Sequence, residues 1–286
     1  MCKEYRLPSE DIVNTRLFKE SLLLCPPKSR REILPIGLDE NDEFIYKKLS
    51  GLEDILIGGT TSSGKTAFIN SLICSILMKH KPSETKLVLI DTRGVEFLNY
   101  KDVPHLLVPI IKDRNKASSI LSSLLKGAKS RRALFKKNNV VNFEQYNNLV
   151  TKIKRKNPNC KEDYLPNIII FIDDYNQFAT PENKKVLEDL LEVNNFTGIH
   201  VICATSNPTE ECITDEMRYY FYSRVCFELP EKKFVRYILS SRNEYEINGR
   251  DTFIFKSPNN NYYKLETIKV EERDIQNIVK AVKENK

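Results

Sequence analysis

Short apolar runs of strand length alternate along the chain with longer stretches in which apolar positions recur at helical spacing. The first four of these runs are separated by long amphipathic stretches, which is the spacing of βαβ crossovers. We therefore predict an α/β fold with a mostly parallel sheet and helices on both faces. The predicted strands are Asp54–Gly58, Lys86–Asp91, Asn167–Asp173, His200–Thr205, Arg224–Glu228 and Thr252–Phe255.

The alternation begins near Leu34, which predicts an irregular lead-in over residues 1–33 and one α/β domain over residues 34–286. Lys152–Lys161 is polar and basic and is expected to form an exposed loop, whereas Val270–Lys286 has the pattern of an amphipathic surface helix. The acid-free basic run Lys126–Lys137 favours the solvated face of an outer helix, with DNA contact as the alternative.

Composition narrows the class of protein. The chain has 286 residues, of which 41% are hydrophobic, and this suffices for a sizeable core. It contains no run of about 18 apolar residues and no apolar segment near Met1, so neither a membrane span nor a signal peptide is predicted. Seven cysteines without a C-x-x-C pair argue against a disulfide framework and favour a reducing cytoplasm. The net charge of +6 permits a nucleic-acid partner without requiring one.

A phosphate-binding loop follows the first predicted strand. The pattern is glycine, four residues, glycine, lysine and a hydroxyl residue, with a helical stretch directly after it. The alternative is a chance match in a turn, but the strand before and the helix after the loop favour a nucleotide site. Lys65 would reach the β- and γ-phosphates of ATP, and the Thr66 hydroxyl would hold Mg²⁺. The nucleotide-binding residues are Gly59, Thr60, Thr61, Ser62, Ser63, Gly64, Lys65 and Thr66.

Two carboxylates end the apolar strand Asn167–Asp173. In phosphate-loop enzymes an aspartate at this position supports Mg²⁺, and the following acid orients or deprotonates the attacking water. We assign the first role to Asp173 and the second to Asp174; the alternative is that both merely cap a turn. The predicted catalytic residues are therefore Lys65, Asp173 and Asp174.

Several segments of the chain resemble segments of the motor domain of the FtsK/SpoIIIE DNA translocases and occur in the same order as in that family. The phosphate loop alone is generic, but two blocks make the similarity specific: Val103-Pro-His-Leu-Leu107 and Ala204-Thr-Ser-Asn-Pro208. Leu89-Ile-Asp-Thr-Arg-Gly-Val-Glu-Phe97 and Gly198-Ile-His200 add to it, and Tyr5-Arg-Leu-Pro-Ser9 looks like the family's linker. The resemblance implies a RecA-like fold that assembles as a hexameric ring and hydrolyses ATP to pump double-stranded DNA.

The resemblance also implies which partners to expect. Because the family's membrane spans and winged-helix domain have no counterpart here, we expect a bare motor that acts as a homo-hexamer or in a mixed ring, either alone or with a separate membrane partner. Basic residues of the family's DNA channel fall on Arg218, Lys232 and Arg236, although surface cations are also common without such a role.

Three departures from the family pattern concern residues that take part in ATP hydrolysis in the family. The family has glutamate where this chain has Asp174, glutamine at Ser206, and at Asn195 an arginine that acts on a neighbour's γ-phosphate. Because such an arginine can be worth ~10³–10⁵ in rate, the resemblance predicts weak hydrolysis unless Arg224 or another residue substitutes.

Three functions remain open from the sequence. The chain is an ATP-driven translocase of double-stranded DNA, a nucleotide-binding but hydrolysis-poor regulator or assembly partner, or a secretion-type motor that moves polypeptide. The retained cations favour DNA over polypeptide. A small-molecule kinase is disfavoured because no lid or acceptor-binding motif is evident.

Overall fold

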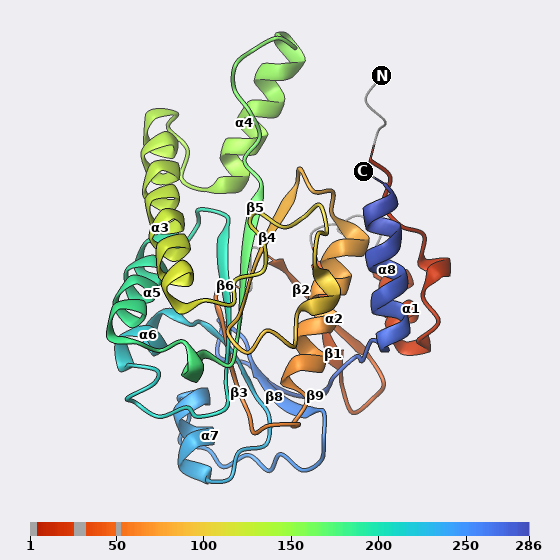
Figure 1. The fold of residues 1–286 in the computed structure, drawn as a ribbon, viewed down its shortest axis with the longest axis vertical. Helices are drawn as coiled ribbons and strands as arrows, with labels where there is room; N and C mark the ends of the chain where they lie inside the picture. Colours follow the sequence, from red (N-terminus) through yellow and green to blue (C-terminus); the bar gives the residue numbers. More distant parts are fainter. Residues whose placement is uncertain (1–4, 26–32, 50–52, 286) are drawn as a thin grey trace.

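The computed structural model describes residues 5–25, 33–49 and 53–285. Within these ranges the strands form one nine-stranded sheet in the order β2-β1-β9-β8-β7-β3-β6-β5-β4 (Figure 1). The strands are β1 Ile33–Leu38, β2 Phe44–Lys48, β3 Ile55–Gly58, β4 Thr85–Asp91, β5 Asn167–Asp173, β6 Ile199–Thr205, β7 Ser223–Cys226, β8 Thr252–Lys256 and β9 Tyr262–Glu266.

The parallel part of the sheet is the part that the sequence predicts. Strands β7, β3, β6, β5 and β4 pair in parallel, whereas β8, β9, β1 and β2 extend the sheet with antiparallel pairs. All six predicted strands are present. The α/β class and the parallel core are therefore confirmed, and the antiparallel extension adds β1, β2 and β9, which the sequence pattern did not identify.

Helices cover both faces of the sheet, as predicted (Figure 1). Alternate residues of one strand point to opposite faces, so Ile57 joins the core under α2 and α8, while Leu56 joins the core under α3, α5 and α7. The helices are α1 Arg16–Leu23, α2 Lys65–Lys79, α3 Arg114–Lys137, α4 Phe143–Lys156, α5 Pro181–Asn194, α6 Asp215–Tyr220, α7 Lys232–Leu239 and α8 Glu272–Glu284.

The lead-in is not irregular throughout. It contains α1, whose Phe18 and Leu22 are buried in the same core as α2 and α8. The Asp274 carboxylate at the start of α8 accepts hydrogen bonds from the backbone N–H groups of Asn14 and Thr15. Residues 1–4 and 26–32 of the lead-in lie outside the described residues. The helix was missed because Pro8, Pro26 and Pro27 indicate breaks in the segment, although the stretch between them can form a helix.

Two expectations for the basic segments need correction. The predicted loop Lys152–Lys161 begins only after Lys156, because α4 continues to that residue. In α3 the run Lys126–Lys137 is an outer helix as expected, but Arg131 within it is buried, and its guanidinium donates to the carbonyl oxygens of Thr197 and Pro166, at 2.8 Å each. The predicted C-terminal helix is confirmed as α8. In the part of the chain that the structure describes, no helix is long and apolar enough to cross a membrane.

Candidate functional site

The phosphate loop lies at the carboxyl edge of the parallel strands. It connects β3 to α2, and its backbone is tied to both neighbouring strand ends: Gly59 N–H donates to Thr205 O at 3.2 Å and Thr60 N–H to Glu228 O at 2.9 Å. The strand, loop and helix context predicted for this motif is confirmed. In such a loop the N–H groups at the start of the helix form an anion site, because they have no partner within the helix.

Gly64 sits where no other residue fits. Its φ of +119° is a conformation that side chains avoid, and a Cβ there would lie 2.9 Å from the Cα of Asp251 and 2.9 Å from the Phe227 ring. Asp251 also donates its N–H to Ser63 O at 2.9 Å, so the start of β8 supports the loop from the side. The Ser63 hydroxyl is buried without a hydrogen-bond partner among the described residues, which suits a loop built to receive an additional ligand.

The Lys65 ammonium is held by the loop itself. Its Nζ donates to the carbonyl oxygens of Gly59 and Thr60, at 2.7 Å each. Burial lowers the pKa of Lys65, and the carboxylates of Asp173 and Asp174 act in the opposite direction. The loop and the acid pair also lie close together in the sheet, because Gly59 N–H donates to Thr205 O at the end of β6, and β6 pairs in parallel with β5, which ends at Asp173. The two halves of the predicted nucleotide site are therefore neighbours at the carboxyl edge.

Asp173 is the carboxylate best placed to support a cation. It ends β5 beside Asp91 of β4, with which it is in register. The Asp91 carboxylate is already used, since it accepts the N–H groups of Gly94 and Glu96 at 2.8 Å each. Asp173 is buried, and this burial raises its pKa to about 6.

Asp174 is fixed by a small hydrogen-bond network. It adopts a left-handed conformation with φ of 47°. Its Oδ1 accepts the Ser206 hydroxyl at 2.8 Å and the Asn176 amide at 3.2 Å, and that amide also donates to the Ser206 hydroxyl at 2.8 Å. Two of the departures from the family pattern, Asp174 and Ser206, thus contact each other. Asn176 was not identified from the sequence, because nothing in its local pattern separates it from an ordinary turn residue.

Arg93 is a second residue that the sequence analysis missed. Its Nη2 lies 3.4 Å from Asp173 Oδ2 and 3.6 Å from Glu96 Oε1, and its Nε lies 3.9 Å from Asp174 Oδ2. Its side chain is 45% exposed. The available signals were its position two residues after a strand-ending aspartate and its place in the block Leu89–Phe97 that resembles the family, and neither gives it a role by itself.

The residues present fit a magnesium nucleotide. No cluster of three or more potential His, Cys, Asp or Glu metal ligands occurs among the described residues. Mg²⁺ in nucleotide enzymes needs no such cluster, because it binds one or two protein oxygens and completes its coordination shell with phosphate oxygens and water. Asp173 and the Thr66 hydroxyl can supply those protein oxygens.

The three predicted DNA-binding residues come together around α7, on helices rather than loops. Lys232 and Arg236 both bind Glu244, with N–O distances of 2.7 and 2.8 Å, and both are largely exposed. Arg218 of α6 donates to Tyr237 O at 3.2 Å, and its guanidinium lies 4.1 Å from the centre of the Tyr237 ring. Their DNA contact stays a prediction.

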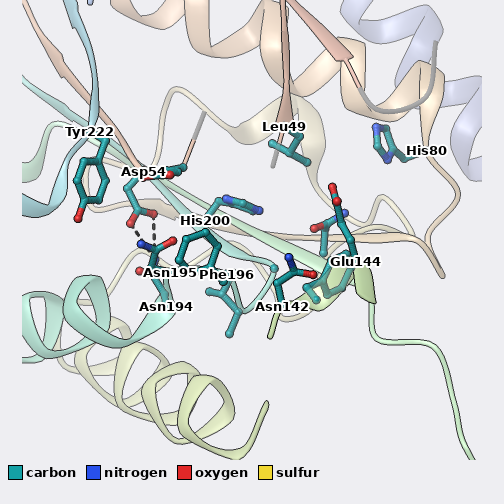
Figure 2. A pocket seen from close by; sticks show the side chains of 15 residues that line it. Leu49, Asp54, His80, Asn142, Glu144, Asn194, Asn195, Phe196, His200 and Tyr222 are labelled. Atoms are coloured by element: carbon teal, nitrogen blue, oxygen red, sulfur yellow. Dashed lines mark hydrogen bonds between the residues drawn. The ribbon is translucent and has the colours of Figure 1, made fainter. Parts of the chain in front are cut away.

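Asn195 lies at the opposite edge of the sheet, in a cavity of about 350 Å³ (Figure 2). Asn194, beside it, donates to both oxygens of Asp54, at 2.9 and 3.0 Å. No residue of the phosphate loop and no Lys or Arg is among the described residues that line this cavity. The cavity therefore is not the nucleotide site, and it holds no cation that would replace an arginine at Asn195.

Arg224 cannot take over that role either. It is buried, and its guanidinium donates to the carbonyl oxygens of Phe221 and Ile238, at 3.0 and 2.9 Å. These bonds join β7 to the ends of α6 and α7. The expectation that Arg224 might substitute for the missing arginine is thus disfavoured by its structural use.

Comparison with solved structures shows the same fold in two other proteins. The pCW3 conjugation coupling protein TcpA gives a TM-score of 0.67 at 18% identity, over 83% of this chain and 66% of that one. The cytoplasmic domain of the Type VII secretion ATPase EccC from Thermomonospora curvata gives 0.74 at 17% identity, over 93% of this chain and 33% of that one.

Sequence comparison is more specific. DNA translocase FtsK from Halalkalibacterium halodurans is 31% identical over 254 residues, and that from Bacillus cereus is 32% identical over 226 residues. These matches cover 87% and 78% of this chain but only 32% and 28% of the relatives, so the chain spans about a third of their length. The model of the FtsK/SpoIIIE family matches residues 24–229. With its phosphate loop and acid pair at the carboxyl edge of a parallel sheet, the chain belongs to the FtsK/SpoIIIE family.

Proposed function

We propose that this chain is an ATP-driven motor that moves double-stranded DNA through a ring. The observation that carries the proposal is that the phosphate loop with Lys65 and the acid pair Asp173–Asp174 follow the carboxyl ends of β3 and β5, which both pair in parallel with β6. The site occurs in a family whose matched relatives are named DNA translocases. We take residues 34–286 as the motor domain.

Each residue of the site has a distinct task in this proposal. Thr66 and Asp173 would hold Mg²⁺, which supplies charge neutralisation of the phosphates when bound. Lys65 would exchange its two carbonyl partners for β- and γ-phosphate oxygens. Asp174, held in place by Ser206, would orient the attacking water. Aspartate is one methylene shorter than the family's glutamate. The hydrogen bond from Ser206 fixes the shorter carboxylate in one orientation.

DNA contact would use Arg218, Lys232 and Arg236. Cations on phosphates give affinity and salt dependence but no sequence preference, which suits a motor that moves along any duplex. Glu244 must release Lys232 and Arg236 before they engage DNA fully. A hexamer or a mixed ring would repeat these contacts around the duplex. We place this motor in the cytoplasm, beside a separate membrane partner; the free thiols of the six cysteines in the described ranges fit a reducing compartment.

A hydrolysis-poor partner is the second candidate. Asn195 favours it, because the cavity around this residue offers no cation. In that case the chain would bind ATP as a regulatory or assembly subunit. A mixed ring would then take its hydrolysis from another chain.

One assay separates these functions. We expect ATP hydrolysis by the purified chain to be stimulated by long duplex DNA and abolished by Lys65→Ala. Tight ATP binding without turnover at any DNA concentration would instead establish the regulatory function. Stimulation by an unfolded polypeptide but not by DNA would identify a protein-moving motor. The charge-matched control is Lys126→Ala on the outer helix α3, which should leave the stimulated rate unchanged.

A further inference from the structure

Arg93 lies at the candidate nucleotide site and supplies a positive charge there from the same chain, not from a neighbouring subunit. It stands at the carboxyl edge, just after β4, and its guanidinium lies within 4 Å of three carboxylates: Asp173, Asp174 and Glu96. The phosphate loop that carries Lys65 follows β3 at the same edge, and β3 and β5 both pair with β6. Arg93 and Lys65 thus lie at the same edge of the sheet as the acid pair.

We propose that Arg93 contacts the γ-phosphate of ATP in cis and replaces the arginine that the family supplies from a neighbouring subunit. This role rests on the proposed ATP hydrolysis. An arginine contributed in cis is an established alternative in other phosphate-loop enzymes. Arg93 is therefore assigned as a catalytic residue of this chain.

The contacts of Arg93 are those of a residue that can change partners. At 3.4 to 3.9 Å its ion pairs are longer than the 2.7 to 2.9 Å of an optimal charged hydrogen bond. Its side chain is 45% exposed, and no hydrogen bond from it to a backbone carbonyl is recorded in the described part of the chain. Asp173 would attract Arg93 less while it holds Mg²⁺, and the γ-phosphate would then offer the guanidinium an anionic partner.

Other arginines near the sheet differ in this respect. Arg131 and Arg224 are both buried and donate to backbone carbonyl oxygens that join separate elements. Moving either one would leave buried carbonyls without donors, at a cost in stability. Arg93 binds carboxylates at the edge of the sheet instead, so its movement leaves no buried carbonyl without a donor.

The chemistry assigned to Arg93 is charge stabilisation. In hydrolysis the water oxygen forms a bond to the γ-phosphorus, and the bond from that phosphorus to the β–γ bridging oxygen breaks. ADP leaves with the electron pair of that bond, and the proton of the water passes to Asp174. Negative charge on the γ-phosphoryl oxygens persists through this transfer, and a guanidinium beside them lowers the barrier.

The test compares Arg93→Gln and Arg93→Lys with the wild type. Affinities for ADP and for a non-hydrolysable ATP analogue are measured with Mg²⁺ by calorimetry, and hydrolysis is measured with duplex DNA. We expect Arg93→Gln to weaken binding of the ATP analogue about tenfold, to leave ADP binding unchanged and to lower hydrolysis by ~10³-fold. Arg93→Lys should restore part of the preference for the triphosphate.

The control is Glu96→Gln, which removes a carboxylate partner of Arg93 but leaves the positive charge of Arg93 in place. This variant should retain the preference for the ATP analogue. Equal loss of ADP and ATP-analogue binding in Arg93→Gln, or an undiminished preference for the analogue, would overturn the assignment. A wild type that never hydrolyses ATP would refute the proposed motor function. The binding comparison would still decide whether Arg93 senses the γ-phosphate, so the two failures are distinguishable.

Discussion

Glu244 restrains two of the three cations proposed to bind DNA, so its removal should strengthen DNA binding. Lys232 and Arg236 stand one helical turn apart on α7, and both donate to the same carboxylate. Glu244→Gln removes the negative charge while keeping the shape of the side chain. Both cations then become available to phosphates.

The size of the effect follows from counterion release. Each additional phosphate contact steepens the dependence of log K on log salt by ~0.9, so two contacts steepen it by ~1.8 per chain. Raising the salt concentration fourfold should then weaken the binding of Glu244→Gln by about tenfold more than it weakens the wild type. At low salt the variant should bind more tightly than the wild type.

Fluorescence anisotropy with a labelled random-sequence duplex between 50 and 200 mM salt measures both quantities. Glu20→Gln is the matched control, because Glu20 forms an exposed ion pair with Arg16 on α1, away from α7. An unchanged slope in Glu244→Gln would show that Lys232 and Arg236 do not lie on the DNA path. The same slope increase in Glu20→Gln would show a general effect of net charge.

Two further predictions concern the phosphate loop and the opposite edge of the sheet. Gly64→Ala should abolish ATP binding and lower the melting temperature, because the added Cβ would clash with Asp251. The control is Gly127→Ala, whose Cβ would lie in open space on α3 and which should stabilise the protein by ~0.5–1 kcal/mol. Equal behaviour of the two variants would contradict the reasoning. Burial raises the pKa of Asp54 to about 7, so the folded protein retains a proton that the unfolded chain releases at lower pH. The free energy of unfolding should therefore fall by a few kcal/mol as pH rises from ~4 to ~7, and Asp54→Asn should flatten this fall in urea titrations; an equally steep fall in the variant would refute the assignment.

The sequence predicted the parts of the fold that local pattern determines. The strand before Gly59 and the strand that ends at Asp173 are apolar throughout because helices cover both of their faces. Strands β2 and β9 were missed because they are half-exposed and mix charged with aromatic residues, as Phe44–Lys48 does. Their place in the sheet depends on partners far away in the sequence.

The candidate site divides in the same way. The phosphate loop is continuous in sequence, and its pattern carries its chemistry. Arg93 and Ser206 contact the acid pair from the connections that follow β4 and β6, and only the fold brings them there. Asn176 lies two residues after Asp174, but its bond to Ser206 also depends on the fold. Ser206 was noted as a departure from the family, but its bond to Asp174 follows from the adjacency of β5 and β6.

The hydrogen bonds of Lys65 to its own loop have a consequence for selectivity. A motor that handles DNA is surrounded by phosphodiesters, each of which carries a single charge. The Lys65 ammonium already holds two carbonyl oxygens at 2.7 Å, so an incoming anion must outcompete both of them. A triphosphate with its metal offers several charged oxygens at once, whereas a backbone phosphate of the cargo offers too little. Under the proposed function, the loop would therefore bind a metal-bound triphosphate in preference to the phosphodiesters of DNA.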